Sequence, residues 1–318
     1  SVMSPETAIA FGKFGGLGVL DLEGLWTRFD DPEPLLAEIA DLPAKQATAR
    51  MQEIYREPIK GGLIRERLGQ IREAGVPVAG ALSPQRTQQF YDDVLKAGAD
   101  LFVIRGQTVS AEHVSQNQEP LNLKKFIYEL DVPVIVGGVA TYTAALHLMR
   151  TGAAGVLVGF GGGAASTTRR VLGIHAPMAT AISDVAGARR DYMDESGGRY
   201  VHVIADGGVG TSGEIVKAIA CGADAVMIGA ALARATEAPG RGWHWGSEAR
   251  HAHLPRGNRV EVGQVAPMEE VLFGPAGSAN GISNLVGALK HSMATTGYSE
   301  LKEFQRAEMI VAQYATTN

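Results

Sequence analysis

Residues 200–230 read YVHVIADGGVGTSGEIVKAIACGADAVMIGA. The apolar run at 200–205 predicts a buried strand, and a glycine turn separates it from an amphipathic stretch at 212–220 that predicts a helix. Gly222 ends this helix, and a second apolar run at 225–228 follows almost at once. A strand, a helix and a strand joined by turns this short predict one parallel β/α unit.

The same alternation of apolar runs and amphipathic stretches extends along most of the chain. The runs that predict strands are 17–20, 76–82, 101–104, 132–136, 155–158, 200–205 and 225–228. The stretches that predict helices between them are 63–73, 87–95, 121–130, 142–149, 180–194 and 212–220. After these units, helices are predicted at 268–272, 285–295 and 301–304, followed by a short strand at 309–311. A helix at 4–14 has no strand before it, so we expect an eighth strand upstream of Ser1.

Eight β/α units predict an α/β fold of the (β/α)8 TIM-barrel type, with its active site at the carboxyl ends of the strands. A doubly wound open sheet is the competing architecture. It calls for an early Gly-x-Gly-x-x-Gly turn and an acid about 20 residues later, and neither is present.

We assign 1–232 to the barrel core. The stretch 238–259 has no period, which is typical of an active-site flap, here bounded at 233–263. Residues 264–318 form a closing segment of the same domain.

Composition narrows the function classes. The formal charge of −5 and the pI near 5.9 argue against a nucleic-acid surface. Polar residues interrupt every apolar run, so we expect no membrane span. The one cysteine, Cys221, excludes an internal disulfide and is compatible with a cytoplasmic protein. It ends a predicted helix and is interpreted as a packing residue. The aromatic and histidine residues at 243–245 have no set of acids or cysteines around them, so we favour packing over metal binding.

Three predicted strands end in glycine-rich turns. Glycine lets backbone N–H groups converge on an anion because no Cβ stands in the way, so the sequence predicts a phosphate site there. Asp206, at a strand end, is placed to accept hydrogen bonds from a ribose diol; helix capping is the structural alternative. The predicted binding residues of these turns are Gly161, Gly163, Asp206, Gly207, Gly208, Gly229 and Ala230.

At this point the chain resembles the IMP dehydrogenase / GMP reductase family. The resemblance rests on PVIVGGVAT at 133–141, VGFG at 158–161, IADGGV at 204–209, EAPG at 237–240, VEVG at 260–263, VGA at 286–288 and LKE at 301–303. Only a linker's length of residues, 21–34, stands where most IMP dehydrogenases insert regulatory CBS domains. The chain is therefore built like GMP reductase or like the CBS-less bacterial IMP dehydrogenase-related proteins, and it is more similar to the second group.

The resemblance implies a homotetramer that binds a purine nucleoside monophosphate (IMP or GMP), with NAD or NADP as cofactor and a monovalent cation at the loop 161–166. It places Gly246, in the flap, over the purine base. It also implies a catalytic role for the residue at 166 and for Thr168. The family uses a cysteine thiolate at the first of these positions, where this chain has Ser166.

Several departures from the family pattern bear on catalysis. A serine hydroxyl is a far weaker nucleophile than a thiolate unless a base activates it, and the nearest histidine, His175, is more simply a surface residue. Arg105 stands where the family usually has an aspartate, Asp21 follows Leu20 where a His-Lys pair is usual, and Arg256 falls where GMP reductases have a catalytic glutamate. The sequence thus leaves three functions open: a purine-nucleotide oxidoreductase, a catalytically inactive purine-nucleotide-binding regulator or partner protein, and a barrel acting on another phosphorylated metabolite.

Overall fold

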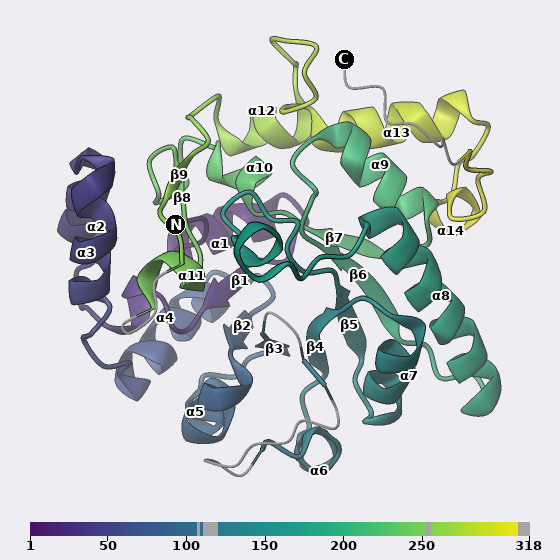
Figure 1. Ribbon diagram of the computed structural model, residues 1–318, viewed down its shortest axis with the longest axis horizontal. Coiled ribbons are helices and arrows are strands. Elements are labelled where there is room, and N and C mark those ends of the chain that lie inside the picture. The colour runs from purple at the N-terminus through teal and green to yellow at the C-terminus, as the bar shows by residue number, and fades with distance from the viewer. Residues whose placement is uncertain (107–108, 111–119, 252–255, 311–318) are drawn as a thin grey trace.

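A computed structural model describes residues 1–106, 109–110, 120–251 and 256–310. Its main feature is a sheet of seven parallel strands that pair in chain order and curl into a barrel-like wall (Figure 1). The strands are β1 (Val19–Asp21), β2 (Ala79–Leu82), β3 (Leu101–Arg105), β4 (Val134–Val139), β5 (Gly155–Val158), β6 (His202–Asp206) and β7 (Ala225–Met227). β1 and β7 are the edges of this sheet, and seven is the number of strands that the sequence predicts for this stretch of chain.

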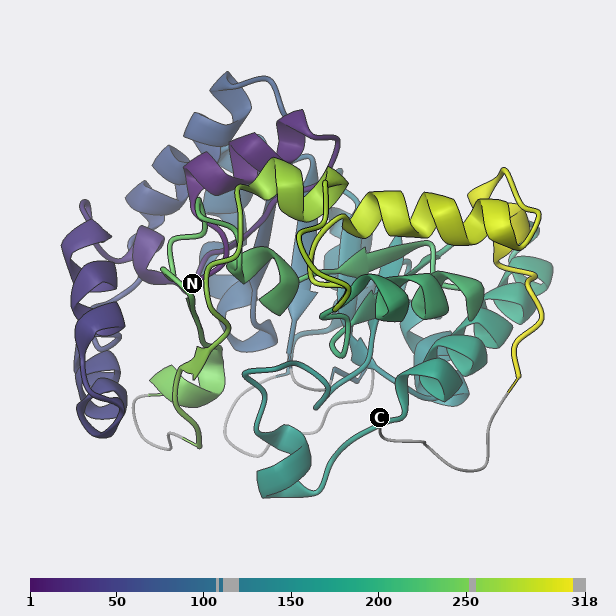
Figure 2. The ribbon, with the colours of Figure 1, turned by 90° about the horizontal axis from the view of Figure 1, so that it is seen from above.

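Helices surround the outer face of the sheet (Figure 1). Those that follow the β/α alternation are α1 (Pro5–Lys13), α4 (Gly61–Glu73), α5 (Pro84–Lys96), α6 (Leu123–Glu129), α7 (Tyr142–Arg150), α8 (Met178–Glu195), α9 (Ser212–Ala220) and α10 (Ala230–Ala233). The closing helices are α12 (Met268–Phe273), α13 (Leu285–Thr295) and α14 (Leu301–Phe304). The second of these, α13, lies along α9 (Figure 2).

Local sequence explains where these helices start and stop. Ser4 accepts a hydrogen bond from the amide of Thr7 at the start of α1, and Thr211 forms a capping box with Glu214 at the start of α9. Glycines with positive φ follow the ends of four helices, as the sequence predicts, because a left-handed residue there lets the chain turn back. They are Gly75, Gly98, Gly152 and Gly222.

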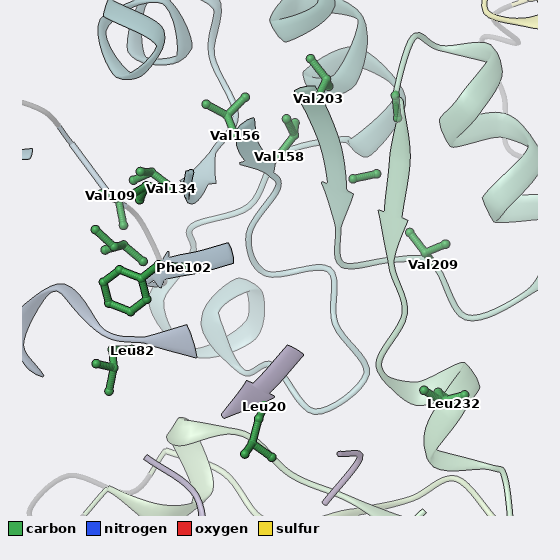
Figure 3. Packing of buried hydrophobic residues seen from close by; sticks show 14 of the residues in the cluster. Leu20, Leu82, Phe102, Val109, Val134, Val156, Val158, Val203, Val209 and Leu232 are labelled. Atoms are coloured by element: carbon green, nitrogen blue, oxygen red, sulfur yellow. The ribbon is translucent and has the colours of Figure 1, made fainter. Parts of the chain in front are cut away.

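Two apolar clusters hold the barrel together, one on each face of the sheet. Successive side chains of a strand point to opposite faces, so Phe102 of β3 and Val156 of β5 pack outward against the helices (Figure 3). The alternate residues Val103, Leu157 and Ile204 point inward and form a separate buried cluster inside the barrel. These side chains fill the interior below the carboxyl ends of the strands, the end at which barrels of this kind bind their ligands.

The structure also adds elements that periodicity does not predict. Within the flap, β8 (Trp243–His244) pairs antiparallel with β9 (Val260–Glu261), and the short helix α11 (Ser247–Arg250) lies between them. The helices α2 (Glu33–Asp41) and α3 (Ala44–Ile54) lie side by side next to the barrel, with the short helix η1 (Leu25–Thr27) before them (Figure 1). The predicted strand at 309–311 is wrong for Met309 and Ile310, which are not in a strand and are exposed; residue 311 lies outside the described residues.

Candidate functional site

Charged side chains form the first layer above the buried interior of the barrel. Asp21, Arg105 and Asp206 each come two residues after an inward-facing residue of β1, β3 or β6. The period of two along a strand therefore turns all three toward the barrel axis, at the carboxyl ends of the strands. This layer is the floor of the mouth.

Arg105 and Asp206 form a forked ion pair across this floor. Nε of Arg105 donates to Oδ2 of Asp206 at 2.9 Å, and a terminal guanidinium nitrogen donates to Oδ1 at 3.3 Å. The Asp206 side chain is 12% exposed, whereas that of Arg105 is 53% exposed. The attraction of Asp206 raises the pKa of Arg105 above its ordinary value. The residue that the sequence assigns to a ribose diol therefore already has a charged partner within the protein.

Two of the three predicted glycine turns come together at the mouth. An ideal Cβ on Gly162 would lie 3.1 Å from the amide nitrogen of Gly208, and one on Gly207 would lie 3.3 Å from the amide nitrogen of Gly163. A side chain at Gly162 or Gly207 would therefore crowd the backbone of the opposite turn. Among the hydrogen bonds between described residues, none has an amide of these four glycines as its donor. A cluster of N–H groups without such bonds can donate to an anion, and we call Gly161–163 with Gly207–208 the glycine cradle.

The third predicted turn lies one strand further along the barrel. Met227 is in register with Asp206, and Gly229 follows two residues later at the start of α10. An ideal Cβ on Gly229 would lie 3.5 Å from Nε2 of His244 in the flap. Burial lowers the pKa of His244 to about 4, so this histidine is neutral at physiological pH. Gly229 thus faces His244 in the flap, and Ala230 follows it as the first residue of α10.

Ser166 meets a carboxylate from the flap. Its Oγ donates to Oε1 of Glu248 at 3.1 Å, and Oγ1 of Thr168 lies 3.5 Å from the same oxygen. Thr168 is buried and begins the π-helical segment η2 (Thr168–Leu172). His175 is exposed, and Ser166 hydrogen-bonds to Glu248 instead. The group able to accept a proton from Ser166 is therefore a glutamate 82 residues away in the chain.

Sequence reasoning did not identify Glu248, although one signal was present. Glu248 is the only acidic residue between Ala238 and Arg259. It comes two residues after the predicted site residue Gly246, whose ideal Cβ would lie 3.0 Å from Oε2 of Glu248. Arg256, at the position expected for a catalytic glutamate, donates its amide to the carbonyl of Glu248 at 2.8 Å. The acid therefore reaches the site from α11.

Buried aromatic and ionic contacts fix the flap over the mouth. Trp245 is 5% exposed, and its Nε1 donates to the hydroxyl of Tyr55 at 3.0 Å. Arg250 lies over the ring of Tyr55, at 4.9 Å from its centroid, and pairs with Asp21 at 2.8 Å. Arg259 stacks on Trp243 at 4.1 Å. These contacts join α11 to β1 and α3, and they position Glu248.

The one cysteine lies away from this mouth. Cys221 follows α9, at the opposite end of the barrel, and burial raises the pKa of its thiol. Within the described ranges no group of three or more His, Cys, Asp or Glu residues is arranged to hold a metal ion. None of the described helices is long and apolar enough to cross a membrane.

The fold and this site define a class: an α/β barrel with an anion cradle and a flap-covered hydroxyl–carboxylate pair at the carboxyl ends of its strands. Residues 1–257 match the IMP dehydrogenase / GMP reductase domain. The chain belongs to the IMP dehydrogenase / GMP reductase family.

Known relatives and a solved structure support this assignment. An uncharacterised oxidoreductase of Mycobacterium tuberculosis (strain H37Rv) is 51% identical over 319 residues, which cover 98% of this chain and 85% of that protein. The inosine-5′-monophosphate dehydrogenase of Thermoplasma acidophilum is 45% identical over 149 residues, 47% of this chain and 28% of that protein. A crystal structure of an IMP dehydrogenase/GMP reductase-like protein from Corynebacterium glutamicum superposes with a TM-score of 0.91, at 48% identity over 98% of this chain and 83% of that one.

Proposed function

We propose that this protein binds a purine nucleoside monophosphate, IMP or GMP, at the barrel mouth and acts on it as an NAD- or NADP-linked oxidoreductase. The observation that carries the proposal is the glycine cradle beside Ser166, Thr168 and Glu248. Amides that have no partner within the described chain suit a phosphate, because each can donate a charge-assisted hydrogen bond to it.

The proposed binding mode assigns each part of the nucleotide to one part of the mouth. The phosphate lies on Gly161, Gly163, Gly207 and Gly208, and the sugar lies above Asp206. The purine base lies under the flap near Gly246, close to Ser166. Gly229 and Ala230 line the same mouth on the side of His244.

Ser166 and Thr168 are the proposed catalytic residues. Glu248 is within hydrogen-bond distance of both hydroxyls, so it is placed to accept a proton as one of them reacts or to return it afterwards. A carboxylate is a weak base for an alcohol, which limits the nucleophilicity of Ser166 compared with a thiolate.

The resemblance further implies a nicotinamide cofactor, which supplies hydride transfer when bound. The described residues single out no nicotinamide-binding side chains. We also propose a monovalent cation at the loop 161–166, a homotetramer and a cytoplasmic location. The chain is proposed to divide into a core (1–232), a flap (233–263) and a closing segment (264–318).

One observation favours a second function, that of a purine-nucleotide-binding regulator without turnover. A hydroxyl on Ser166 stands in the place of the family's thiolate, while the cradle that would bind the phosphate is complete. Binding and turnover are separate properties of this site, so one pair of assays distinguishes the two functions.

Calorimetric titration with GMP and with IMP tests the binding claim. Absorbance at the nicotinamide band, with GMP plus NADPH and with IMP plus NAD, tests the reaction. Binding with turnover supports the oxidoreductase, and binding without turnover by either pair supports the regulator. If neither nucleotide binds, the proposal is wrong and another phosphorylated metabolite becomes the better ligand class.

A further inference from the structure

We propose that Arg105 sets the sugar selectivity of the mouth, so that the site accepts 2′-deoxyribonucleoside monophosphates as well as ribonucleoside monophosphates. The inference rests on the proposed function, because it concerns the sugar of the nucleotide that the cradle binds. It goes beyond that function by naming a wider ligand class and the residue responsible.

The geometry of the ion pair carries the argument. The guanidinium of Arg105 donates to both carboxylate oxygens of Asp206, at 2.9 and 3.3 Å. With 12% of its side chain exposed, Asp206 offers little of its carboxylate to a ligand, whereas Arg105 is about half exposed. A sugar that approaches the floor of the mouth therefore meets the guanidinium first.

The chemistry of the two groups decides what a ribose hydroxyl gains there. A 2′-hydroxyl that donates to an available carboxylate forms a charge-assisted hydrogen bond. Here guanidinium N–H groups, which only donate, take two of the roughly four acceptor positions of the Asp206 carboxylate, and burial leaves little of the rest to a ligand. The hydroxyl can accept from Arg105 instead, but an exposed guanidinium is already hydrated, so this exchange gains little.

The pair is also well fixed in place. Arg105 and Asp206 end two strands of the same sheet, each two residues beyond a buried interior side chain, Val103 and Ile204. Both backbones are therefore held by the ladder and the interior cluster. A forked guanidinium–carboxylate contact between two rigid strand ends resists displacement by a neutral hydroxyl.

The test compares GMP with 2′-deoxy-GMP, because the ratio of their affinities isolates the 2′-hydroxyl. In the unaltered protein we expect a ratio below about 3, the small value for a neutral or hydrated contact. In Arg105→Ala, Asp206 becomes available to the ribose, and we expect the preference for GMP to rise to about tenfold or more, as for a hydrogen bond to a charged group. In the double variant Arg105→Ala/Asp206→Ala the preference for GMP over 2′-deoxy-GMP should fall back to about the value of the unaltered protein, because the carboxylate is gone.

Arg150→Ala is the matched control. Arg150 also forks onto a carboxylate, that of Glu195, at 2.8 and 2.6 Å, but on the outer helices α7 and α8. The variant Arg150→Ala should leave the ratio of the GMP and 2′-deoxy-GMP affinities unchanged. Arg105→Lys gives a second measurement that retains the positive charge: a single ammonium replaces the fork, and we expect a ratio between those of the unaltered protein and Arg105→Ala.

Circular dichroism and thermal unfolding establish that each variant is folded before titration. Strong discrimination by the unaltered protein, or a ratio in Arg105→Ala that stays the same or falls, overturns the inference. If neither GMP nor 2′-deoxy-GMP binds any of the folded proteins, the proposed function itself fails. That result differs from binding with an unaltered ratio, so the two failures are distinguishable.

Discussion

Ser166 donates a hydrogen bond from its Oγ to Oε1 of Glu248 at 3.1 Å, which joins the glycine-rich loop to the flap. Neither residue has a neighbour in sequence that explains the contact. It exists because α11 is anchored through Arg250 and Trp245 to β1 and α3. The flap of this protein therefore contributes a carboxylate to the loop that the family uses for its nucleophile.

Replacing the serine by cysteine tests the electrostatic effect of this contact. In Ser166→Cys the sulfur would lie next to the carboxylate of Glu248, and a like charge disfavours the thiolate, so the pKa of the thiol should be raised. Adding Glu248→Gln removes that charge, and we expect alkylation of residue 166 by iodoacetamide at about pH 7.5 to be roughly tenfold faster in the double variant. Peptide mass mapping separates this thiol from Cys221. Equal rates in the two variants would show that Glu248 does not act on position 166.

The glycine cradle predicts that one methyl group should impair phosphate binding. In Gly162→Ala the new Cβ would lie 3.1 Å from the amide nitrogen of Gly208 and would obstruct its approach to an anion. We expect GMP affinity to fall about tenfold or more in calorimetry, the cost of a lost hydrogen bond to a charged group. Gly69→Ala in α4 is the control, because its Cβ meets nothing within 4 Å and should leave affinity unchanged. Unchanged affinity in Gly162→Ala would place the phosphate elsewhere.

The anchor of the flap predicts a loss of stability in Tyr55→Phe. The hydroxyl of Tyr55 accepts from Trp245 Nε1 at 3.0 Å, and the two side chains are 7% and 5% exposed. Removing it leaves a buried donor without a partner, so the free energy of unfolding should fall by about 1–3 kcal/mol in denaturant titrations. Tyr128→Phe, at a residue that is 90% exposed, should change little. Equal stability of the two variants would argue against a buried hydrogen bond at Trp245.

Asp224, at the amino-terminal end of the barrel, predicts a pH dependence of stability. Burial alone would raise its pKa, but hydrogen bonds from Lys302, Tyr200, the amide of Val203 and Gln305 outweigh burial and lower the pKa from 3.8 to about 2. A carboxyl whose pKa is lowered by folding stabilises the protein above the pKa of the unfolded chain, and this stabilisation is lost as the pH falls from about 4 to 2. The stabilisation that the ionised carboxyl contributes at neutral pH amounts to about 2 kcal/mol.

Asp224→Asn should therefore lower the free energy of unfolding at neutral pH by about 3 kcal/mol, because Arg189 and Lys302 lose their charged partner. The difference in the free energy of unfolding between the variant and the unaltered protein should become smaller as the pH falls through 4 toward 2. Urea unfolding at several pH values measures it. Glu195→Gln, which removes an exposed carboxylate paired with Arg150, is the control and should show little effect. A gap that is constant with pH would contradict the assigned role of the Asp224 charge.

Much of the barrel could be predicted because its signals are local. The alternation of apolar runs with amphipathic stretches gave the seven strands in the right order, and glycines such as Gly98 and Gly222 marked the helix ends. The helix α3 was not predicted because it contains few large apolar residues. The strand expected at 309–311 failed for Met309 and Ile310, because an apolar run does not form a strand where no neighbouring strand pairs with it.

The site was predictable only in part. The inward direction of Arg105 and Asp206 follows from strand alternation, which the sequence contains, but their pairing depends on how tightly the barrel curls. The position of Glu248 depends on contacts of Trp245 and Arg250 with residues about 190 and 229 positions earlier. No pattern within a window of sequence contains such contacts.

The sequence by itself determined the alternating elements, the family and the glycine turns at the strand ends, because each depends on residues close together in the chain. The tertiary structure decided which turns meet, which partner Asp206 has and which acid reaches Ser166. These are distances between strand ends and an anchored flap, and they are set by the packing of the barrel as a whole.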